Sequence, residues 1–547
     1  MSRWGIIAER YSRREKNIRM QQVIDSINQD SDYWNTFSIN DNDIDFINNY
    51  LFENETPRTA RELSPVLFEA RIEREKQREL DLHAGKGKIY IPLENYKVDE
   101  DLVFPQLEWS EGKVISVRQG INPDIASFSV MEVEFAGKQI RQFAFELADH
   151  KLNTLSDANE ENEEGVKKEI FAKVAGNIES KLESALLKDK GLVRIAGRWF
   201  PKSLLVDINI GHLNLAEAVL DEVNGGPLDT ETIMKQMEMP EGINSNLLEF
   251  SMNYALQEDS RFDEVGPAGQ VLWCLERLEP ESVRKVPAEL KFNVDNAEIT
   301  DLSDDLKSLE YELDDELSEL SNVEEVLQEE VTICLTYPHW RAGTLPVSAR
   351  INPFIPYAYE SERIRFALID SKSKEEIPAW VVRKNKYVFG LKDLYDQYEL
   401  LPGSLIRLKR SKKPGFIIFE PLVHRPKKEW IRTVLVGRDG GIVFATLKQN
   451  VTAEFNERMI VAVPDVSGVD TAREKFSKNK KSFKDNVYTV MKDLSKLNLQ
   501  GHVHAQELYS AFNIVMRCPP APLFSQLVTD ERYTHVGDLH FRIEEAG

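Results

Sequence analysis

Apolar residues along the first part of the chain follow a helical spacing. In residues 41–52, Ile44, Ile47 and Leu51 recur at intervals of three and four, which predicts a helix. Pro57 then opens a second predicted helix, because a proline's missing N–H costs nothing in a first turn. This arrangement within residues 1–83 is typical of a helix-turn-helix and equally of a plain helical hairpin.

The apolar pattern then changes to strand-like alternation in residues 86–150. Glycine-containing turns separate the alternating stretches, so we expect a small β-barrel of SH3-like size. The predicted strands cover residues 113–118, 128–135 and 139–145.

An acidic, polar stretch at 156–165 predicts a solvated linker within residues 151–200. Apolar residues at 170, 171, 174, 178, 182 and 186 follow at helical spacing, so a helix is expected over residues 166–187.

Residues 201–293 carry three helical patterns followed by two short strands. The helices are expected at 213–223, 230–237 and 245–257, and the strands at 261–266 and 271–275. Three helices followed by a hairpin is the layout of a winged helix.

Residues 466–547 repeat this layout more loosely, with predicted helices at 476–497, 505–512 and 522–528. The chain then has an aspartate, an arginine, an aromatic residue, a valine and a glycine in this order, at Asp530, Arg532, Tyr533, Val536 and Gly537. The same order of residue types occurs between Asp259 and Gly266. The shared order predicts a divergent internal repeat and a second winged helix.

Two further segments lie between these modules. Residues 294–330 have leucines at spacings of three and four among many acids, which predicts an acidic amphipathic helix or a short coiled coil. Residues 331–465 are rich in strand patterns, and the last two predicted strands cover residues 430–436 and 441–444. The predicted fold class is therefore α+β and multidomain, with winged-helix modules, a small SH3-like barrel and a strand-rich basic domain. A length of 547 residues also exceeds what a single hydrophobic core supports.

The segment at 213–278 resembles the family of HARE-type winged helix-turn-helix domains, which includes the delta subunit of bacterial RNA polymerase. The resemblance rests on the break at Gly225, Gly226 and Pro227, on Gly266, and on the returning strand with Trp273 and Leu275. A weaker resemblance to the same family covers residues 473–545. The family implies a role in transcription through contact with RNA polymerase, DNA or another protein complex, and it does not imply catalysis.

The rhythm of strands in the basic domain is also similar to that of a B3-type pseudobarrel. Residues 363–370, the strand with Trp380, residues 387–391 and residues 400–404 carry this likeness. It supports DNA binding by this region.

Charge is distributed unevenly along a chain whose formal net charge is −23. Residues 294–330 contain fifteen acids and one lysine, whereas residues 401–450 contain eleven lysines or arginines and three acids. Cations neutralise phosphates and release counterions, so the basic stretch predicts a nucleic-acid partner. A solvated hairpin and an acidic protein surface remain alternative interpretations. The internal acidic segment could itself be that surface.

The predicted nucleic-acid-binding residues form two groups. The first, with aromatic residues such as Phe416 and Trp430 interleaved, is Arg407, Lys409, Arg410, Lys412, Lys413, Arg425, Lys427, Lys428 and Arg432. The second precedes the C-terminal module and consists of Lys478, Lys480 and Lys481. Residues 245–257, the predicted recognition helix of the first winged helix, hold no lysine or arginine, so that module is expected to contact protein.

Enzyme signatures are missing from the sequence. No phosphate-binding loop, dinucleotide-binding turn, zinc-protease motif or serine elbow occurs, so we expect neither catalysis nor a cofactor. The three cysteines and the histidines show no metal-ligand spacing. A nuclease would require carboxylates converging near Lys291. No apolar stretch suits a signal peptide or a membrane span, which favours a cytoplasmic location.

Together these patterns predict a non-enzymatic adaptor associated with transcription or DNA. The C-terminal half would bind nucleic acid, while the acidic helix and the first winged helix would bind protein. The alternative is a scaffold or specificity component of a multi-protein complex without nucleic-acid contact. The oligomeric state has no signal in the sequence.

Overall fold

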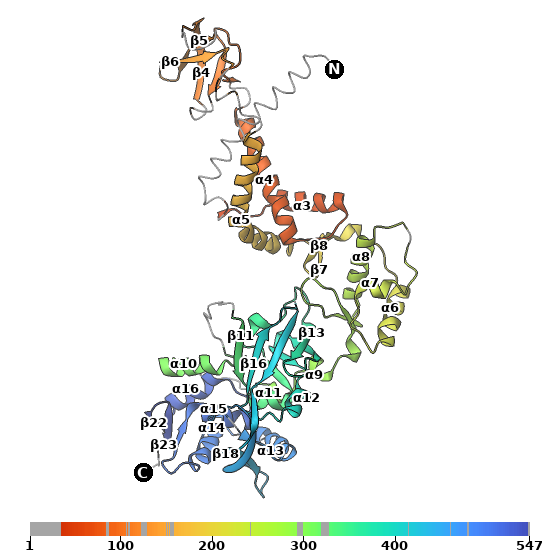
Figure 1. Cartoon of the computed structure of the whole chain (residues 1–547), viewed down its shortest axis with the longest axis vertical. Coiled ribbons are helices and arrows are strands. Elements are labelled where there is room, and N and C mark those ends of the chain that lie inside the picture. Colours follow the sequence, from red (N-terminus) through yellow and green to blue (C-terminus); the bar gives the residue numbers. More distant parts are fainter. Residues whose placement is uncertain are drawn as a thin grey trace. The chain divides into compact units, whose positions relative to one another are not determined.

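The computed structural model has a mixed α+β fold with several separate sheets (Figure 1). It divides into two compact units, Met1–Leu205 and Val206–Gly547. The described residues are 34, 36–83, 87–104, 107, 110–121, 128–148, 150, 153, 158–240, 242–292, 299–318, 328–413, 415–459, 461–478 and 481–544.

A helical module in the first unit is assembled from two separate parts of the sequence. Strand β1 pairs with β8, and β8 pairs with β7, so residues predicted as separate segments share one sheet. The core includes Leu51, Leu67, Ile178 and Leu182. The elements are α3 (Asp41–Asn54), β1 (Arg58–Thr59), α4 (Ala60–His83), α5 (Ala158–Leu186), β7 (Leu192–Ile195) and β8 (Arg198–Pro201).

Helix α5 corrects the predicted linker. It begins at Ala158, inside the acidic stretch that we expected to be irregular up to residue 165. Glutamate, lysine and alanine all favour helices, so the local composition suits this extension.

A five-stranded sheet is inserted between α4 and α5. Three of its strands lie where the alternation predicted them, and the pattern missed the two short strands at the start. Tyr96, Phe104, Met131 and Phe145 fill its core. Its strands, in sheet order, are β2 (Lys88–Ile89), β3 (Asp101–Phe104), β4 (Ser110–Gln119), β5 (Ser129–Phe135) and β6 (Gln139–Phe145).

The second unit begins with a central module, residues 206–290. Leu228 forms an isolated bridge with Trp273, which adds a third strand position beside the hairpin. Its elements are α6 (Ile210–Glu222), α7 (Thr230–Met234), α8 (Ser245–Glu258), β9 (Phe262–Glu264), β10 (Trp273–Leu275) and α9 (Glu281–Arg284).

A seven-stranded sheet follows and curls into a half-barrel. Strand β13 alternates buried and half-buried side chains along its whole length, so one of its faces lines the core. In sheet order the strands are β11 (Glu330–Cys334), β16 (Leu405–Arg410), β17 (Phe416–Pro421), β13 (Arg363–Asp370), β14 (Glu376–Val382), β15 (Tyr387–Phe389) and β12 (Thr344–Pro346). Two short helices accompany it, α11 (Tyr337–Ala342) and α12 (Lys392–Gln397).

A long two-stranded ribbon leads from the half-barrel to the C-terminal module, residues 481–544. The ribbon consists of β18 (Val423–Val436) and β19 (Ile442–Ala453), with β20 (Val461–Ala462) beside β18. Helix α13 (Val466–Lys478) comes next. The C-terminal module then contains α14 (Phe483–Ser495), β21 (His502–His504), α15 (Ala505–Val515), α16 (Pro520–Thr529), β22 (Tyr533–Gly537) and β23 (His540–Ile543).

The acidic segment differs from the predicted long helix. Helix α10 spans only Asp304–Leu313, and Asp314 ends it in a left-handed conformation with φ of 49°. Leu306 and Leu309 enter the core of the C-terminal module, where α10 lies against α16 (Figure 1). The rest of the predicted repeat, at 319–327, lies outside the described residues.

Three segments share one order of elements: a helix, a short strand position, two helices and a hairpin. They are the helical module of the first unit, the central module and the C-terminal module. The first strand pairs with the last in all three, as β1–β8, Leu228–Trp273 and β21–β23.

An aspartate at the end of the third helix recurs with this topology. Asp259 accepts bonds from Arg261 Nε at 3.0 Å and Nη2 at 2.7 Å, and Asp530 accepts the same pair from Arg532 at the same distances. Each arginine also reaches an acid on the module's first helix. In the first unit Asp189 contacts the module's first helix directly, without an arginine in between, by accepting a hydrogen bond from Asn48 on α3.

Candidate nucleic-acid interface

The β18–β19 ribbon is anchored at both of its ends. At one end Val423 and Ala453 pack with the core of the half-barrel, and at the other Val434 and Phe444 enter the core of the C-terminal module. In between, Ile431 and Val451 are buried against Ala462 on one side of the ribbon. The middle of the ribbon is therefore held in place while its other side stays open.

Four residues share that open side, which we call the ribbon face: Lys428, Trp430, Lys448 and Asn450. Trp430 lies directly opposite Lys448, and Lys428 lies opposite Asn450. Alternate residues of a strand point to the same side, which places all four together. Trp430 is 68% exposed, although a side chain of this size is usually well covered.

Arg425 and Lys427 add positive charge to the ribbon next to the ribbon face, and Lys427 belongs to the alternate positions, which point to the other side. Both are exposed, as are Lys428 and Lys448, and none of these four side chains has an ion pair with any residue in the described ranges. The ladder shifts register between Val423 and Lys427, where Pro426 removes a backbone donor.

The predicted basic cluster divides into two groups in the structure. Arg425, Lys427 and Lys428 belong to the ribbon, whereas Arg407, Lys409, Arg410, Lys412 and Lys413 lie on or beside the half-barrel. Lys412 is exposed.

Most half-barrel cations are already paired within the chain. Lys409 contacts Glu420 at 2.9 Å, and this hydrogen bond raises the pKa of Lys409. Arg407 lies 3.5 Å from Glu420 and 3.8 Å from Glu330, the last residue of the acidic segment.

Two further half-barrel cations are also occupied. Arg410 donates to the carbonyls of Gln328 and Pro353, and Lys413 contacts Glu376 at 2.8 Å. Glu330, Glu376 and Glu420 consequently offset part of the positive charge of these half-barrel cations.

Arg432 is withdrawn from the surface. Its guanidinium contacts Glu507 at 3.1 Å and donates to the carbonyls of Glu457 and Arg458. Burial lowers the pKa of Arg432, and only 10% of its side chain is exposed. This residue ties the ribbon to α15 and is therefore not part of the exposed surface of the ribbon.

The three lysines predicted before the C-terminal module are separated from the ribbon face in sequence. Lys478 ends α13 and contacts Glu474 at 3.5 Å, and Lys481 is exposed. Lys480 lies outside the described residues. The third helix of this module, α16, is buried from Pro522 to Leu527 and covered in part by α10.

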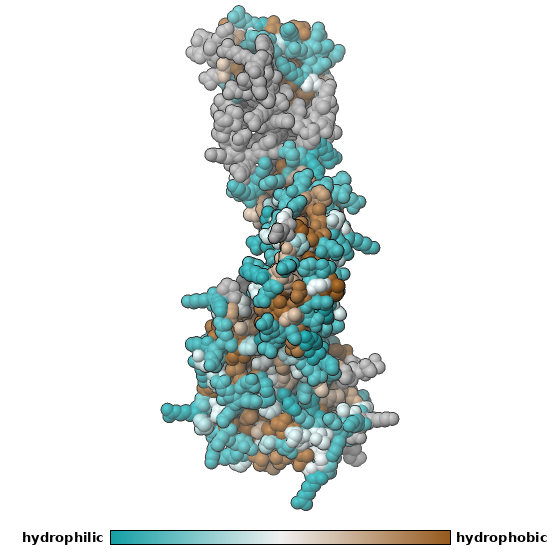
Figure 2. Space-filling model, turned by 90° about the vertical axis from the view of Figure 1, so that its right-hand side faces the viewer, coloured by the Kyte–Doolittle hydropathy of each residue, from teal (hydrophilic) through white to brown (hydrophobic). Residues whose placement is uncertain are grey.

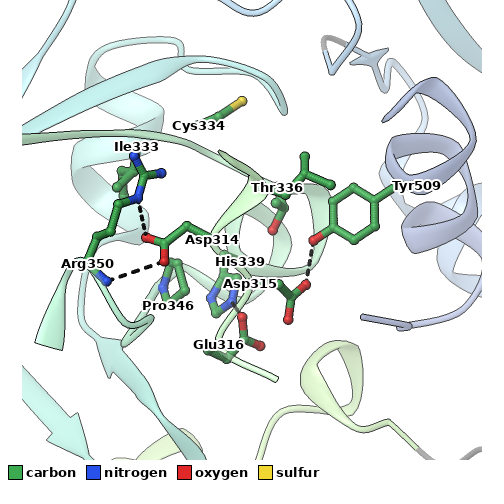
Figure 3. A pocket seen from close by; sticks show the side chains of 11 residues that line it. Asp314, Asp315, Glu316, Ile333, Cys334, Thr336, His339, Pro346, Arg350 and Tyr509 are labelled. Carbon is green, nitrogen blue, oxygen red and sulfur yellow. Dashed lines mark hydrogen bonds and ion pairs between the residues drawn. The ribbon is translucent and has the colours of Figure 1, made fainter. Parts of the chain in front are cut away.

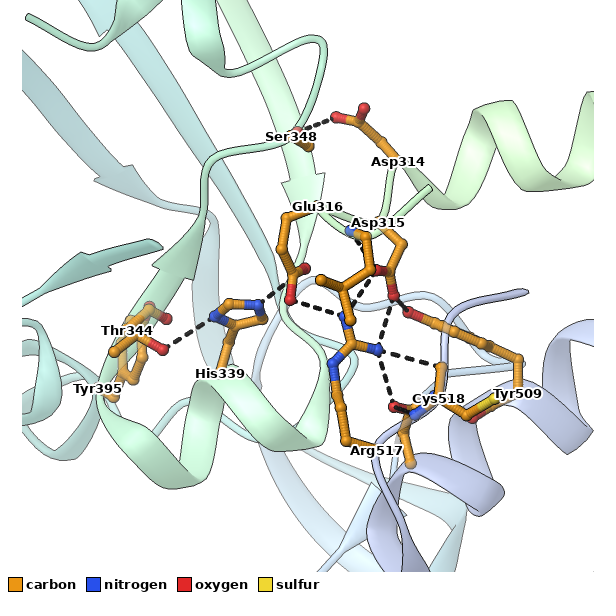
Figure 4. Close-up of polar contacts among 12 residues, drawn as sticks. Asp314, Asp315, Glu316, His339, Thr344, Ser348, Tyr395, Tyr509, Arg517 and Cys518 are labelled. Atoms are coloured by element: carbon orange, nitrogen blue, oxygen red, sulfur yellow. Dashed lines mark hydrogen bonds and ion pairs between the residues drawn. The ribbon is translucent and has the colours of Figure 1, made fainter. Parts of the chain in front are cut away.

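A second polar cluster, the Arg517 network, is buried within the Val206–Gly547 unit. Arg517 donates to both oxygens of Asp315 and to Glu316, and Tyr509 donates to Asp315 (Figure 4). His339 Nε2 lies 3.1 Å from Glu316. Burial alone would raise the pKa of Glu316, but Arg517 and His339 outweigh it and hold that pKa well below its usual range.

The cavity beside this network is small (Figure 3). Its volume of about 10 Å³ is at the lower limit for a single water molecule. Arg350 and Asp314 form an ion pair at its edge, 3.2 Å apart. The network therefore has no room for a substrate, and its carboxylates, which the sequence predicted to belong to an acidic amphipathic helix or short coiled coil, are structural.

Buried carboxylates also join the central module to the half-barrel. Arg363 on β13 contacts Asp263 and Glu279, each at 2.8 Å. Burial raises the pKa of Glu279 to about 8 and that of Glu264 to about 7. Glu264 accepts bonds from Ser361 and from the backbone of Gly266.

Hydrophilic side chains cover most of the face presented in Figure 2, with apolar areas between them. Within the described ranges no group of three or more His, Cys, Asp or Glu side chains is arranged to hold a metal ion. No helix in the described part of the chain is long and apolar enough to cross a membrane.

Sequence reasoning missed Lys448 and Asn450. The strand containing them was predicted to end at residue 444, but β19 continues to Ala453. The largely apolar run from Ile442 to Leu447, which passes the predicted end of the strand, was the available signal.

Comparison with known proteins found no matching family model, no matching curated protein and no matching solved structure.

Proposed function

We propose that this protein is a non-enzymatic, DNA-associated adaptor that binds nucleic acid through the β18–β19 ribbon. One observation carries the proposal. Arg425, Lys427, Lys428 and Lys448 gather on one exposed ribbon without ion-pair partners in the described ranges, in a chain with a net charge of −23. Two-stranded ribbons are known elements for reading DNA grooves, and unpaired cations supply the phosphate contacts.

The three modules with a common order of elements are proposed to be winged helices, with the inserted sheet as an SH3-like barrel. The third helices of the central and C-terminal modules favour contacts with protein. Helix α8 carries no lysine or arginine, and α16 is mostly buried. A transcription complex, as the HARE-type resemblance implied, is the kind of partner that suits such modules.

A scaffold without nucleic-acid contact is the second candidate. The burial of α16 favours it, because this helix cannot enter a groove while α10 covers it. Under that proposal the ribbon would dock on an acidic protein.

The double variant Lys427→Ala/Lys428→Ala tests the first proposal. Fluorescence anisotropy with labelled duplex DNA, at several salt concentrations, would compare the affinity of the double variant with that of the full-length wild type. We expect weaker binding and a salt slope smaller by about 2, since each phosphate contact contributes about 0.9.

Lys372→Ala/Lys374→Ala is the matched control, because both lysines are exposed and the change in net charge is identical. Equal losses in the two double variants would show that the ribbon has no special role. An absence of DNA binding by the full chain would favour the scaffold.

A further inference from the structure

The ribbon face combines cations with an aromatic surface that the protein itself does not cover. Trp430 is 68% exposed, and Lys428, Lys448 and Asn450 surround it on the same side of the ribbon. The nearest acid in sequence, Glu429, belongs to the alternate set of positions, which point to the opposite side.

We propose that the ribbon face binds single-stranded nucleic acid by stacking an unpaired base on the Trp430 indole. This inference rests on the proposed function and specifies its ligand. Base stacking on aromatic residues combined with cations along the backbone is the general chemistry of single-strand recognition.

An unpaired strand suits this geometry better than a duplex. The bases of a duplex are already stacked on one another, so their faces cannot reach an indole on a ribbon. The two lysines would contact phosphates on either side of the stacked base. The Asn450 amide, which both donates and accepts hydrogen bonds, lies where it would meet a base edge.

The platform is also rigid before any ligand arrives. Ile431 and Val451 are buried directly behind the ribbon face, and both ends of the ribbon are packed into cores. Little conformational entropy is lost when a ligand binds a surface that is already ordered.

The test measures binding by the full chain to one labelled sequence presented as single-stranded DNA, single-stranded RNA and duplex DNA. Trp430→Ala is expected to weaken single-strand binding about 5- to 150-fold, the range for one lost stacking contact. Duplex affinity should change by less than about twofold. Trp430→Phe should retain much of the affinity, because the phenyl ring still stacks. Whichever single strand, DNA or RNA, binds more tightly identifies the natural ligand.

Tyr357→Ala is the control, because Tyr357 is 63% exposed and lies outside the ribbon. Quenching of Trp430 fluorescence on binding gives a second readout. The Trp430 signal is obtained by subtracting the fluorescence of Trp430→Phe from that of the wild type. Duplex binding without any effect of Trp430→Ala on single strands would overturn this inference and leave the proposed function standing. A chain that binds none of the three nucleic acids would overturn both.

Discussion

Glu264 shows how burial changes the chemistry of one side chain at a junction between two parts of the molecule. It lies on β9 and accepts bonds from Ser361 and from the backbone of Gly266 and Leu272. These bonds favour the charged carboxylate, and the neighbouring Glu360 opposes it. Burial outweighs them and raises the pKa of Glu264 from 4.5 to about 7.

Stability should consequently fall as pH rises. A carboxyl group with a raised pKa in the folded state binds more protons there than in the unfolded state. Its contribution is complete below about pH 4.5 and is lost as pH rises through about 7. We expect unfolding experiments to show lower stability at pH 8 than at pH 5.

Glu264→Gln removes this titration while keeping the shape of the side chain. Its loss of stability between pH 5 and pH 8 should be smaller than that of the wild type by up to about 3 kcal/mol. Glu258→Gln, at an exposed position on α8, serves as control. Identical pH profiles for Glu264→Gln and the wild type would contradict the assignment.

At the scale of elements, the paired aspartate and arginine fasten each hairpin to the helix before it. Asp530 is buried, and it caps the turn before β22 by accepting the backbone N–H of Arg532 at 3.1 Å. Asp259 does the same for Arg261 at 3.0 Å. The two contacts recur because the local sequence, aspartate then arginine then an aromatic residue, recurs.

Asp530→Ala and Asp259→Ala should each destabilise the chain by about 1–3 kcal/mol, because a half-buried arginine loses its charge-assisted hydrogen bonds in each variant. Chemical denaturation would measure the change. The neighbouring substitutions Glu531→Ala and Ser260→Ala, at exposed positions, should stay within about 0.5 kcal/mol of the wild type. Similar values for all four variants would show that these contacts contribute nothing.

Local periodicity predicted the helices of the central module and the last two helices of the C-terminal module, because an apolar stripe against a core leaves a clear spacing. The single helix predicted at 476–497 was wrong, since α13 ends at Lys478 and Ser482 caps a new helix, α14. Periodicity also failed where partners are distant in sequence. The module in the first unit went unrecognised because an inserted sheet separates α4 from α5. The burial of Asp315 went unrecognised because its partner Arg517 lies 202 residues away.

The same limit applied to the candidate interface. Lys427, Lys428 and Glu429 interrupt the apolar alternation, so β18 was predicted to begin only at residue 430. Clusters of cations were visible in the sequence. Which of them are neutralised by Glu420, Glu376 or Glu507 depends on the pairing of strands and helices.

Across the whole molecule, acids outnumber bases, and the basic ribbon is a local exception. Asp304, Asp305 and Glu312 on α10 are exposed and belong to the same compact unit as the ribbon. Their field opposes the approach of a polyanion, and salt screens that field.

Replacing these three acids by Asp304→Asn, Asp305→Asn and Glu312→Gln changes the net charge from −23 to −20, since three negative charges are removed. We expect DNA to associate faster at low salt, measured by stopped-flow anisotropy, with little difference at about 1 M salt, where the Debye length is about 3 Å. An acceleration that persists at high salt would exclude an electrostatic origin.

The distance between Arg517 and its acidic partners also has a consequence for biosynthesis. Asp315 emerges from the ribosome 202 residues before Arg517 does, which at about 5–20 residues per second is about 10–40 s. The half-barrel is synthesised within that interval, but the acidic segment still lacks its counter-ion and the module that covers its leucines. Assembly of the Val206–Gly547 unit is therefore finished only after almost the entire chain has been translated.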